Sequence, residues 1–349
     1  MLVKMAKQYR RPLLAFYMSS PPRKGDRGQD FRTLPADHPV AADALLDVLI
    51  RDLRARQSLV RSALEDEDET EPRPFVGSVR MSDGVARVLT SLRATIGVDL
   101  AQFRGQVSPE DAFALLRSRV EASGVFVLLI GDLGSHHTAI DLETFRGFAL
   151  ADPIAPFVVI NDHDAKSAWS FTLLHELVHL WLGTTGVSGT STEAAIERFC
   201  NDVAGEFLLP ADELIRLQVN DNTDFATALQ RISDFARERH LSRSMVAYKL
   251  RRIDAISQET WRHISNTFRE QWLRDRATRR DRAQQEEGGP NYYVVRRHRL
   301  GSALLSLVRR TMSDGILTPT KAGKVLGVKP RKVEPLLNWA PPAGRGRAA

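Results

Sequence analysis

Residues 171–183, FTLLHELVHLWLG, form an apolar segment that carries two histidines and a carboxylate: His175, Glu176 and His179. Burying such groups without partners costs several kcal/mol, so something must satisfy them. The spacing H-E-x-x-H places the histidines on one face of a helix, where both imidazoles can bind one metal ion. Glu176 lies one step round the helix and can take a proton from a water at the fourth ligand position. The pattern predicts zinc-dependent hydrolysis with Glu176 as general base.

Core histidines bonded to backbone carbonyls are the alternative to a metal site. The neighbours of the three polar residues are apolar almost all round the helix, and a helix of this kind is buried. Two exposed histidines would need no explanation, whereas two buried ones do, so we favour the metal site. Manganese and iron accept similar ligands, and the sequence does not separate them from zinc.

A zinc site needs a third protein ligand, and the next expected helix, at about 191–210, is the place to look for it. At 100° per residue, Glu193 and Glu197 flank the apolar stripe of this helix on one side and Glu206 flanks it on the other. Asp202 points away. Helix geometry therefore leaves three candidate ligands, each of which could equally be an ordinary solvated carboxylate.

Hydrophobic periodicity predicts the elements that position these residues. Apolar runs at 125–131, 144–152 and 155–162 predict three short strands, the first of them buried. The histidine helix follows and ends at Gly183. A helical period at 39–64 precedes the strands, and the chain beyond about 210 is mainly helical.

Length and composition limit the class of protein. The chain has 349 residues, of which 43% are hydrophobic, as in globular proteins of more than one domain. No apolar run reaches the roughly 18 residues of a membrane span, and the stretch at 13–18 is too short for the core of a signal peptide. Cys200 is the only cysteine, so no internal disulfide can form. We therefore expect a cytoplasmic protein without membrane contact.

The net charge of +6 is unevenly distributed. Residues 261–349 hold 19 Lys and Arg against 7 Asp and Glu, a net of +12, which leaves 30 against 36, a net of −6, for the rest. The basic C-terminal region predicts a contact with nucleic acid or an acidic protein. The alternating signs at 269–287 fit a solvated helix face equally well.

Two segments of the C-terminal third, 232–253 and 317–337, each read as helix, tight turn and helix. In the second, Lys329, Arg331 and Lys332 would face phosphates if it docked on DNA. Many helix-turn-helix units only pack against other proteins or elements, so DNA contact is one of two interpretations.

Three segments between about 155 and 213 resemble the ImmA/IrrE family of zinc metallopeptidases in their order and spacing. They are VVIND, FTLLHELVHLWLG and IERFCNDVAGEFLLPADEL. The resemblance implies that His175 and His179 are metal ligands and that Glu176 is the general base. It also implies that Glu197, followed by Asn201, is the third ligand, which selects among the carboxylates left open above.

Residues 30–35 and 145–153 further resemble family members that carry an N-terminal repressor-type helix-turn-helix. In those members the DNA-binding domain precedes the segment that resembles residues 4–22. The sequence begins at Met1, where that domain would end, so we do not expect it here unless the true start lies upstream.

The resemblance implies an α+β fold that is mostly helical, with a small sheet packed on the H-E-x-x-H helix in a zincin-like core and a helical C-terminal region. It implies a zinc-dependent endopeptidase that cleaves a regulatory protein, expected to be a helix-turn-helix repressor in a phage, mobile-element or stress-response circuit. The alternative is a non-proteolytic module that binds a repressor, a toxin or DNA around a structural zinc. The complete H-E-x-x-H motif favours the peptidase, because a scaffold does not need Glu176.

We expect four segments: an N-terminal arm and helical linker at 1–72, the peptidase core at 73–210, a helix-turn-helix-like region at 211–285 and a basic one at 286–349.

Overall fold

The computed structural model describes residues 2, 5, 16–18, 40–67, 70–184, 190–285 and 291–339. Most of residues 1–39, the first part of the predicted arm and linker at 1–72, lie outside the described residues, and so does the segment at 30–35. Among the described helices, none has a stretch long and apolar enough to cross a bilayer.

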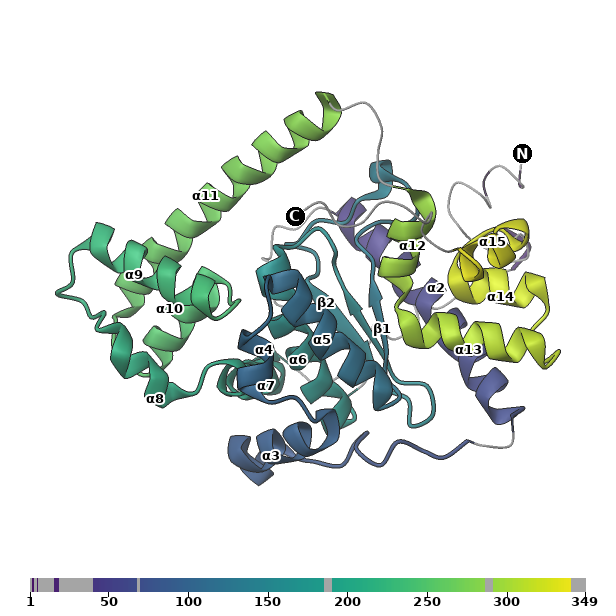
Figure 1. Ribbon diagram of the computed structural model, residues 1–349, viewed down its shortest axis with the longest axis horizontal. Helices are drawn as coiled ribbons and strands as arrows, with labels where there is room; N and C mark the ends of the chain where they lie inside the picture. Colours follow the sequence, from purple (N-terminus) through teal and green to yellow (C-terminus); the bar gives the residue numbers. More distant parts are fainter. Residues whose placement is uncertain are drawn as a thin grey trace.

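A three-stranded sheet divides the molecule into layers (Figure 1). The strand order is β1-β3-β2, and the central strand β3 pairs in parallel with β1 and antiparallel with β2. Every strand residue is buried, which explains why the sequence shows continuous apolar runs in place of alternation. The three predicted strands are confirmed as β1 (Phe126–Leu129), β2 (Gly147–Leu150) and β3 (Phe157–Ile160).

One face of the sheet packs on the larger hydrophobic core. Alternate strand residues point to opposite faces, and Val127, Leu129, Val158 and Ile160 belong to this core. The helices that contribute to it come from the middle of the chain. The last of them, α11 (Gln258–Gln285), extends away from the body on the left of Figure 1. They are α3 (Gly84–Ile96), α4 (Leu100–Arg104), α5 (Pro109–Ala122), α6 (Lys166–Leu182), α7 (Thr190–Leu208), α8 (Ala211–Leu214), α9 (Phe225–Glu238), α10 (Arg243–Arg252) and α11 (Gln258–Gln285).

The opposite face of the sheet packs on a second core made from the two ends of the described chain. Phe126, Leu128, Phe157 and Val159 supply the strand side of this core. The layer that covers them confirms an α+β fold with a helical C-terminal region. It consists of α2 (Val40–Glu65), α12 (Tyr292–Leu300), α13 (Ser302–Ser313), α14 (Pro319–Leu326) and α15 (Val333–Leu337).

These two cores cut across the four expected segments. The larger core joins residues of 73–210 with residues of 211–285, and the second core joins residues of 1–72 with residues of 286–349. The segment boundaries themselves stay a prediction.

Local signals in the sequence set the helix ends that the site depends on. Ser108 Oγ accepts a hydrogen bond from the backbone N–H of Asp111 at 3.1 Å and starts α5. Ser242 Oγ accepts from the N–H of Met245 at 3.2 Å and starts α10. Gly183 ends α6 in the left-handed conformation, with φ of 64°.

A buried ion pair fastens the C-terminal layer to the larger core. Arg117 Nε donates to Glu121 Oε1 at 3.0 Å, and both side chains of α5 are less than one-tenth exposed. Glu121 Oε2 accepts from the N–H groups of Ser302 at 3.0 Å and Ala303 at 3.1 Å, which satisfies the first turn of α13. Arg117 Nη1 donates to the carbonyl of His298 at 2.6 Å, and burial lowers the pKa of Arg117. The pair therefore binds α5 to the junction of α12 and α13.

We expect Glu121→Ala to lower the free energy of unfolding by about 3–5 kcal/mol, because it leaves the charge of Arg117 buried and unpaired. Urea denaturation measures the change. As a control, Arg274→Ala removes an ion pair with Glu270 (Nη2–Oε2 3.9 Å) in which both side chains are exposed. That substitution should cost no more than about 1 kcal/mol. Similar costs for the two variants would contradict the role assigned to Glu121.

Candidate metal centre

Helix α6 carries the H-E-x-x-H motif through the larger core, packed against α7, β2 and β3. Every residue from 169 to 181 except Phe171 is buried. His175, Glu176 and His179 are each at most 1% exposed. The predicted burial of the three polar groups is confirmed.

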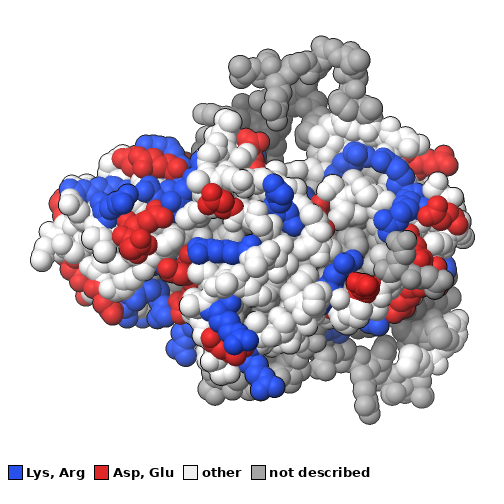
Figure 2. Space-filling view, turned by 60° about the horizontal axis from the view of Figure 1, so that its bottom comes forward, with Lys and Arg blue, Asp and Glu red and all other residues white. Residues whose placement is uncertain are grey.

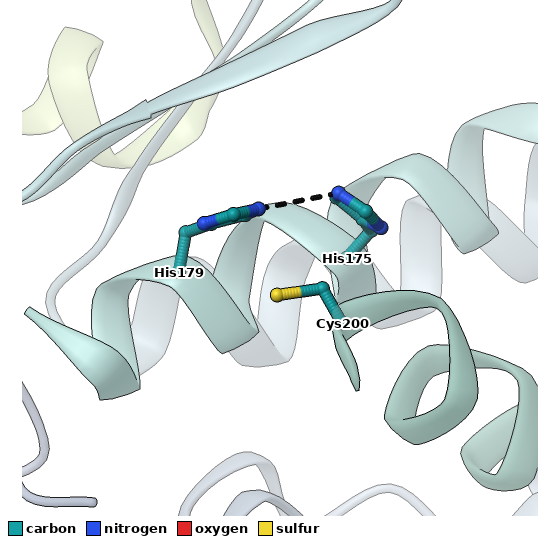
Figure 3. A group of neighbouring side chains, drawn as sticks. All are labelled: His175, His179 and Cys200. Carbon is teal, nitrogen blue, oxygen red and sulfur yellow. Dashed lines mark hydrogen bonds between the residues drawn. The ribbon is translucent and has the colours of Figure 1, made fainter. Parts of the chain in front are cut away.

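The two imidazoles point toward each other from successive turns of α6 (Figure 3), with their Nε2 atoms 3.3 Å apart. His175 Nδ1 donates to Asn201 Oδ1 of α7 at 3.0 Å. His179 Nδ1 donates to Thr184 Oγ1 at 3.2 Å, and that hydroxyl donates in turn to the carbonyl of His179 at 3.4 Å. A neutral imidazole with its proton on Nδ1 carries a lone pair on Nε2. Both lone pairs are therefore directed into the same space.

Glu197 of α7 brings a carboxylate to this space. Its Oε2 lies 3.2 Å from His175 Nε2 and its Oε1 lies 3.5 Å from His179 Nε2. Glu197 Oε2 is buried and accepts no hydrogen bond from the described residues. Two imidazole nitrogens and one carboxylate thus converge at one point of the interior, an arrangement that suits a bound metal ion.

The separations of these donor atoms fit an ion of the size of zinc. Ligand bonds of about 2.0–2.2 Å in a tetrahedron place the ligand atoms about 3.3–3.6 Å apart. The two Nε2 atoms lie 3.3 Å apart, and one oxygen of the Glu197 carboxylate approaches each of them, Oε2 at 3.2 Å from His175 and Oε1 at 3.5 Å from His179. Three protein ligands leave one tetrahedral position for a water or a substrate atom, as in catalytic sites. His175, His179 and Glu197 could therefore hold a divalent metal ion.

Cys200 lies next to this group and was missed by the sequence analysis, which used it only to exclude an internal disulfide. It is fully buried on α7, and its Sγ lies within 4.8 Å of ligand nitrogens of both His175 and His179. Figure 3 shows the sulfur directed toward the two rings. Its position three residues after Glu197, on the same helix face, was the available signal. Because zinc also binds thiolates, Cys200 is a second candidate for the third ligand.

The other two carboxylates left open by helix geometry are not found at this site. Glu206 Oε2 pairs with Lys249 Nζ of α10 at 2.6 Å. The side chain of Glu193 lies outside the described residues. Of the three candidates, the structure brings Glu197 to the histidines.

Glu176 lies between α6 and the first residue of β2. A Cβ atom at Gly147 would lie 2.8 Å from Glu176 Oε1 and 2.6 Å from Thr172 Cγ2. Only glycine at this strand position leaves room for the carboxylate. The sequence analysis did not identify this contact, because no periodicity reports which strand residue faces which helix residue.

The C-terminal end of α6 is held by the segment 75–79. The N–H groups of Gly77 and Val79 donate to the carbonyls of Leu180 and Trp181 at 3.0 and 3.2 Å. The ring of Phe75 stacks on that of Trp181, with centroids 4.3 Å apart. These contacts prevent the end of α6 from fraying. They therefore also hold Thr184, which orients His179, in place.

Residues 127–251 match the peptidase family model described as the IrrE N-terminal-like domain. The match runs from β1 into α10 and includes both the H-E-x-x-H motif and α7. The domain agrees with the predicted resemblance, and no helix-turn-helix domain is found. No curated protein and no solved structure matches the chain.

We expect Asn201→Ala to weaken zinc binding about 10- to 100-fold, because Asn201 sets the tautomer and orientation of His175. Competition with a chromophoric chelator measures the affinity. Asp202→Ala is the matched control, since the neighbouring side chain faces away and binds Arg252 at 2.5 Å. If Asn201→Ala binds zinc as tightly as Asp202→Ala, this hydrogen bond does not support the site.

Proposed function

We propose that this chain, of which residues 127–251 match the IrrE N-terminal-like domain, is a zinc-dependent endopeptidase that acts on a regulatory protein. The observation that carries the proposal is the convergence of His175 Nε2, His179 Nε2 and the carboxylate of Glu197 within 3.5 Å, with Glu176 on the same helix. The sequence resemblance to the ImmA/IrrE family supports a helix-turn-helix repressor as the substrate, in a phage, mobile-element or stress-response circuit.

In this proposal His175, His179 and Glu197 hold the zinc ion. When bound, zinc supplies a Lewis acid that polarises a carbonyl and lowers the pKa of water toward neutrality. Asn201 and Thr184 keep the imidazole protons on Nδ1, so that each Nε2 stays a ligand atom. The buried surroundings exclude competing water and strengthen these interactions.

Glu176 is the general base of the proposed reaction. Its carboxylate accepts a proton from the water that attacks the carbonyl carbon of the scissile peptide bond. The protonated carboxyl then gives this proton to the amide nitrogen as the C–N bond breaks, which returns Glu176 to its starting state. The side chain is 1% exposed and enclosed by β2, so its orientation is fixed before substrate binds.

The edge strand β2 offers a place for the substrate. In the order β1-β3-β2 it pairs only with β3 within the described part of the chain. Its other side can pair with an extended peptide through backbone hydrogen bonds. A peptide added there passes next to Gly147 and therefore next to Glu176.

We expect Glu176→Gln to reduce cleavage by roughly 10²–10⁴-fold, because it removes the base, and to leave zinc content unchanged, because Glu176 is not a ligand. Mass spectrometry of new N-termini in a treated proteome measures cleavage, and elemental analysis measures zinc. His179→Ala should lose the zinc. Glu270→Gln, the same substitution at an exposed position of α11, should behave as wild type.

The Glu176→Gln variant also serves as a trap that keeps its partner bound for identification. If the cellular response persists with Glu176→Gln but vanishes with His175→Ala, the metal is structural and the protein acts by binding. If the Glu176→Gln variant generates the same new N-termini as the wild type, the peptidase proposal is also contradicted.

We expect Gly147→Val to lower kcat by roughly 10²-fold with little change in zinc content, because the added side chain displaces the Glu176 carboxylate. Valine is favoured in strands, so β2 itself should persist. Steady-state kinetics on a cleaved substrate together with far-UV circular dichroism separates the two effects. Wild-type kcat in a folded Gly147→Val variant would show that the contact does not position the base.

A further inference from the structure

A cavity of about 850 Å³ opens in the layer that covers the other face of the sheet, away from the histidines. Its volume lies in the range of small-molecule sites, roughly 300–1,000 Å³. The lining comes from α2, the start of α12, α14 and residues 327–332. Asp52 is the one acidic side chain among the described lining residues, whereas the basic ones are Arg56, Lys324, Lys329, Arg331 and Lys332.

Arg56 of α2 is the most deeply placed of these cations. It is 9% exposed, and its Nε and Nη1 atoms are buried without a hydrogen-bond partner among the described residues. Its Nη2 pairs with Asp52 Oδ2 at 2.6 Å. A buried guanidinium with unsatisfied donors is unfavourable. The Nε and Nη1 atoms are closed off from solvent, so the cavity meets another part of the Arg56 side chain, whose positive charge favours an anion there.

Arg296 of α12 places a second guanidinium at the same point. A Cβ atom at Gly327 would collide with the Nη2 atoms of both Arg56 and Arg296, so the two groups approach one position. Arg296 Nη2 donates to the carbonyls of Leu326 and Gly327 at 2.9 and 2.6 Å, while its Nε is buried without a partner among the described residues. Burial, and then repulsion by Arg56, lower the pKa of Arg296. Asp52 compensates one of these two charges, and a bound anion would compensate the other.

The basic residues expected to face DNA phosphates, Lys329, Arg331 and Lys332, line this cavity. The helix that follows them, α15, has five residues, of which three are buried, so it is not an exposed recognition helix. Figure 2 shows basic side chains in an arc over the right-hand lobe, whereas the left-hand lobe mixes both signs. The contact with DNA predicted from the charge excess stays a prediction.

We propose that this cavity binds the phosphate groups of a small ligand of nucleotide size. Arg56 and the exposed Lys324 and Lys329 bring positive charge to the lining, and basic side chains of this kind bind phosphate oxygens. Tyr292, half-exposed in the lining, offers a ring beside the phosphate site. A small ligand is favoured over a nucleic-acid strand because Arg56 is recessed beyond the reach of a surface-bound backbone.

Thermal denaturation and calorimetry of the full chain with ATP and with tripolyphosphate test the proposal. We expect at least one of the two probes to bind and to raise the Tm of the wild type. Arg56→Met should weaken that binding roughly 10- to 100-fold, as expected for loss of hydrogen bonds to a charged group. Without ligand, Arg56→Met should melt no lower than wild type, because it removes a buried, incompletely satisfied charge.

Lys321→Gln is the control, because Lys321 lies on α14 but does not line the cavity and should leave binding unchanged. The double variant Lys324→Gln, Lys329→Gln changes two exposed lining residues and should also bind the probe more weakly. Because both positions are exposed, this result does not depend on whether the core accepts a substitution. No binding of either probe to the wild type would overturn the proposal, as would full binding by Arg56→Met. If a single-stranded oligonucleotide binds more tightly than ATP and tripolyphosphate, and this binding depends on Arg56, the ligand is a nucleic acid and the proposal of a small ligand is wrong.

Discussion

Two imidazoles and one carboxylate converge inside the larger core, and the elements within residues 127–251 are arranged around this convergence. The Nε2 atoms of His175 and His179 and the carboxylate of Glu197 lie 3.2–3.5 Å apart. Asn201 and Thr184 fix the other nitrogen of each ring, so the lone pairs cannot turn away. In the proposed function this group holds a metal ion, and its buried surroundings keep the site poor in water.

The sequence predicts those parts of this arrangement that depend on short-range periodicity. The apolar runs predict the strands, and the four-residue spacing places His175 and His179 on one face of α6. Helix geometry alone leaves three carboxylates, and the motif around Glu197 selects among them. The contacts of Gly147 and Cys200 depend on how β2 and α7 cross α6, which no local pattern encodes.

The positive charge of the C-terminal region does not determine from the sequence what this region binds. A net charge of +12 fits a solvated helix, a nucleic-acid surface or an anion-binding cavity equally well. The proposed anion-binding cavity depends on Arg56, a residue of α2 far away in the sequence that packs against α14. The same layer is tied to the peptidase core by Glu121, which caps α13. Both contacts join segments more than 150 residues apart, beyond the range of any motif.

Zinc K-edge X-ray absorption on the purified protein tests the central claim most directly, because it reports the elements bound to the metal. We expect nitrogen and oxygen neighbours at about 2.0–2.2 Å with the multiple-scattering signature of two imidazoles. This result would assign the third position to Glu197. A sulfur neighbour at about 2.3 Å would assign it to Cys200 instead and contradict the proposed ligand set. A protein that holds no zinc at all would contradict the metal centre itself.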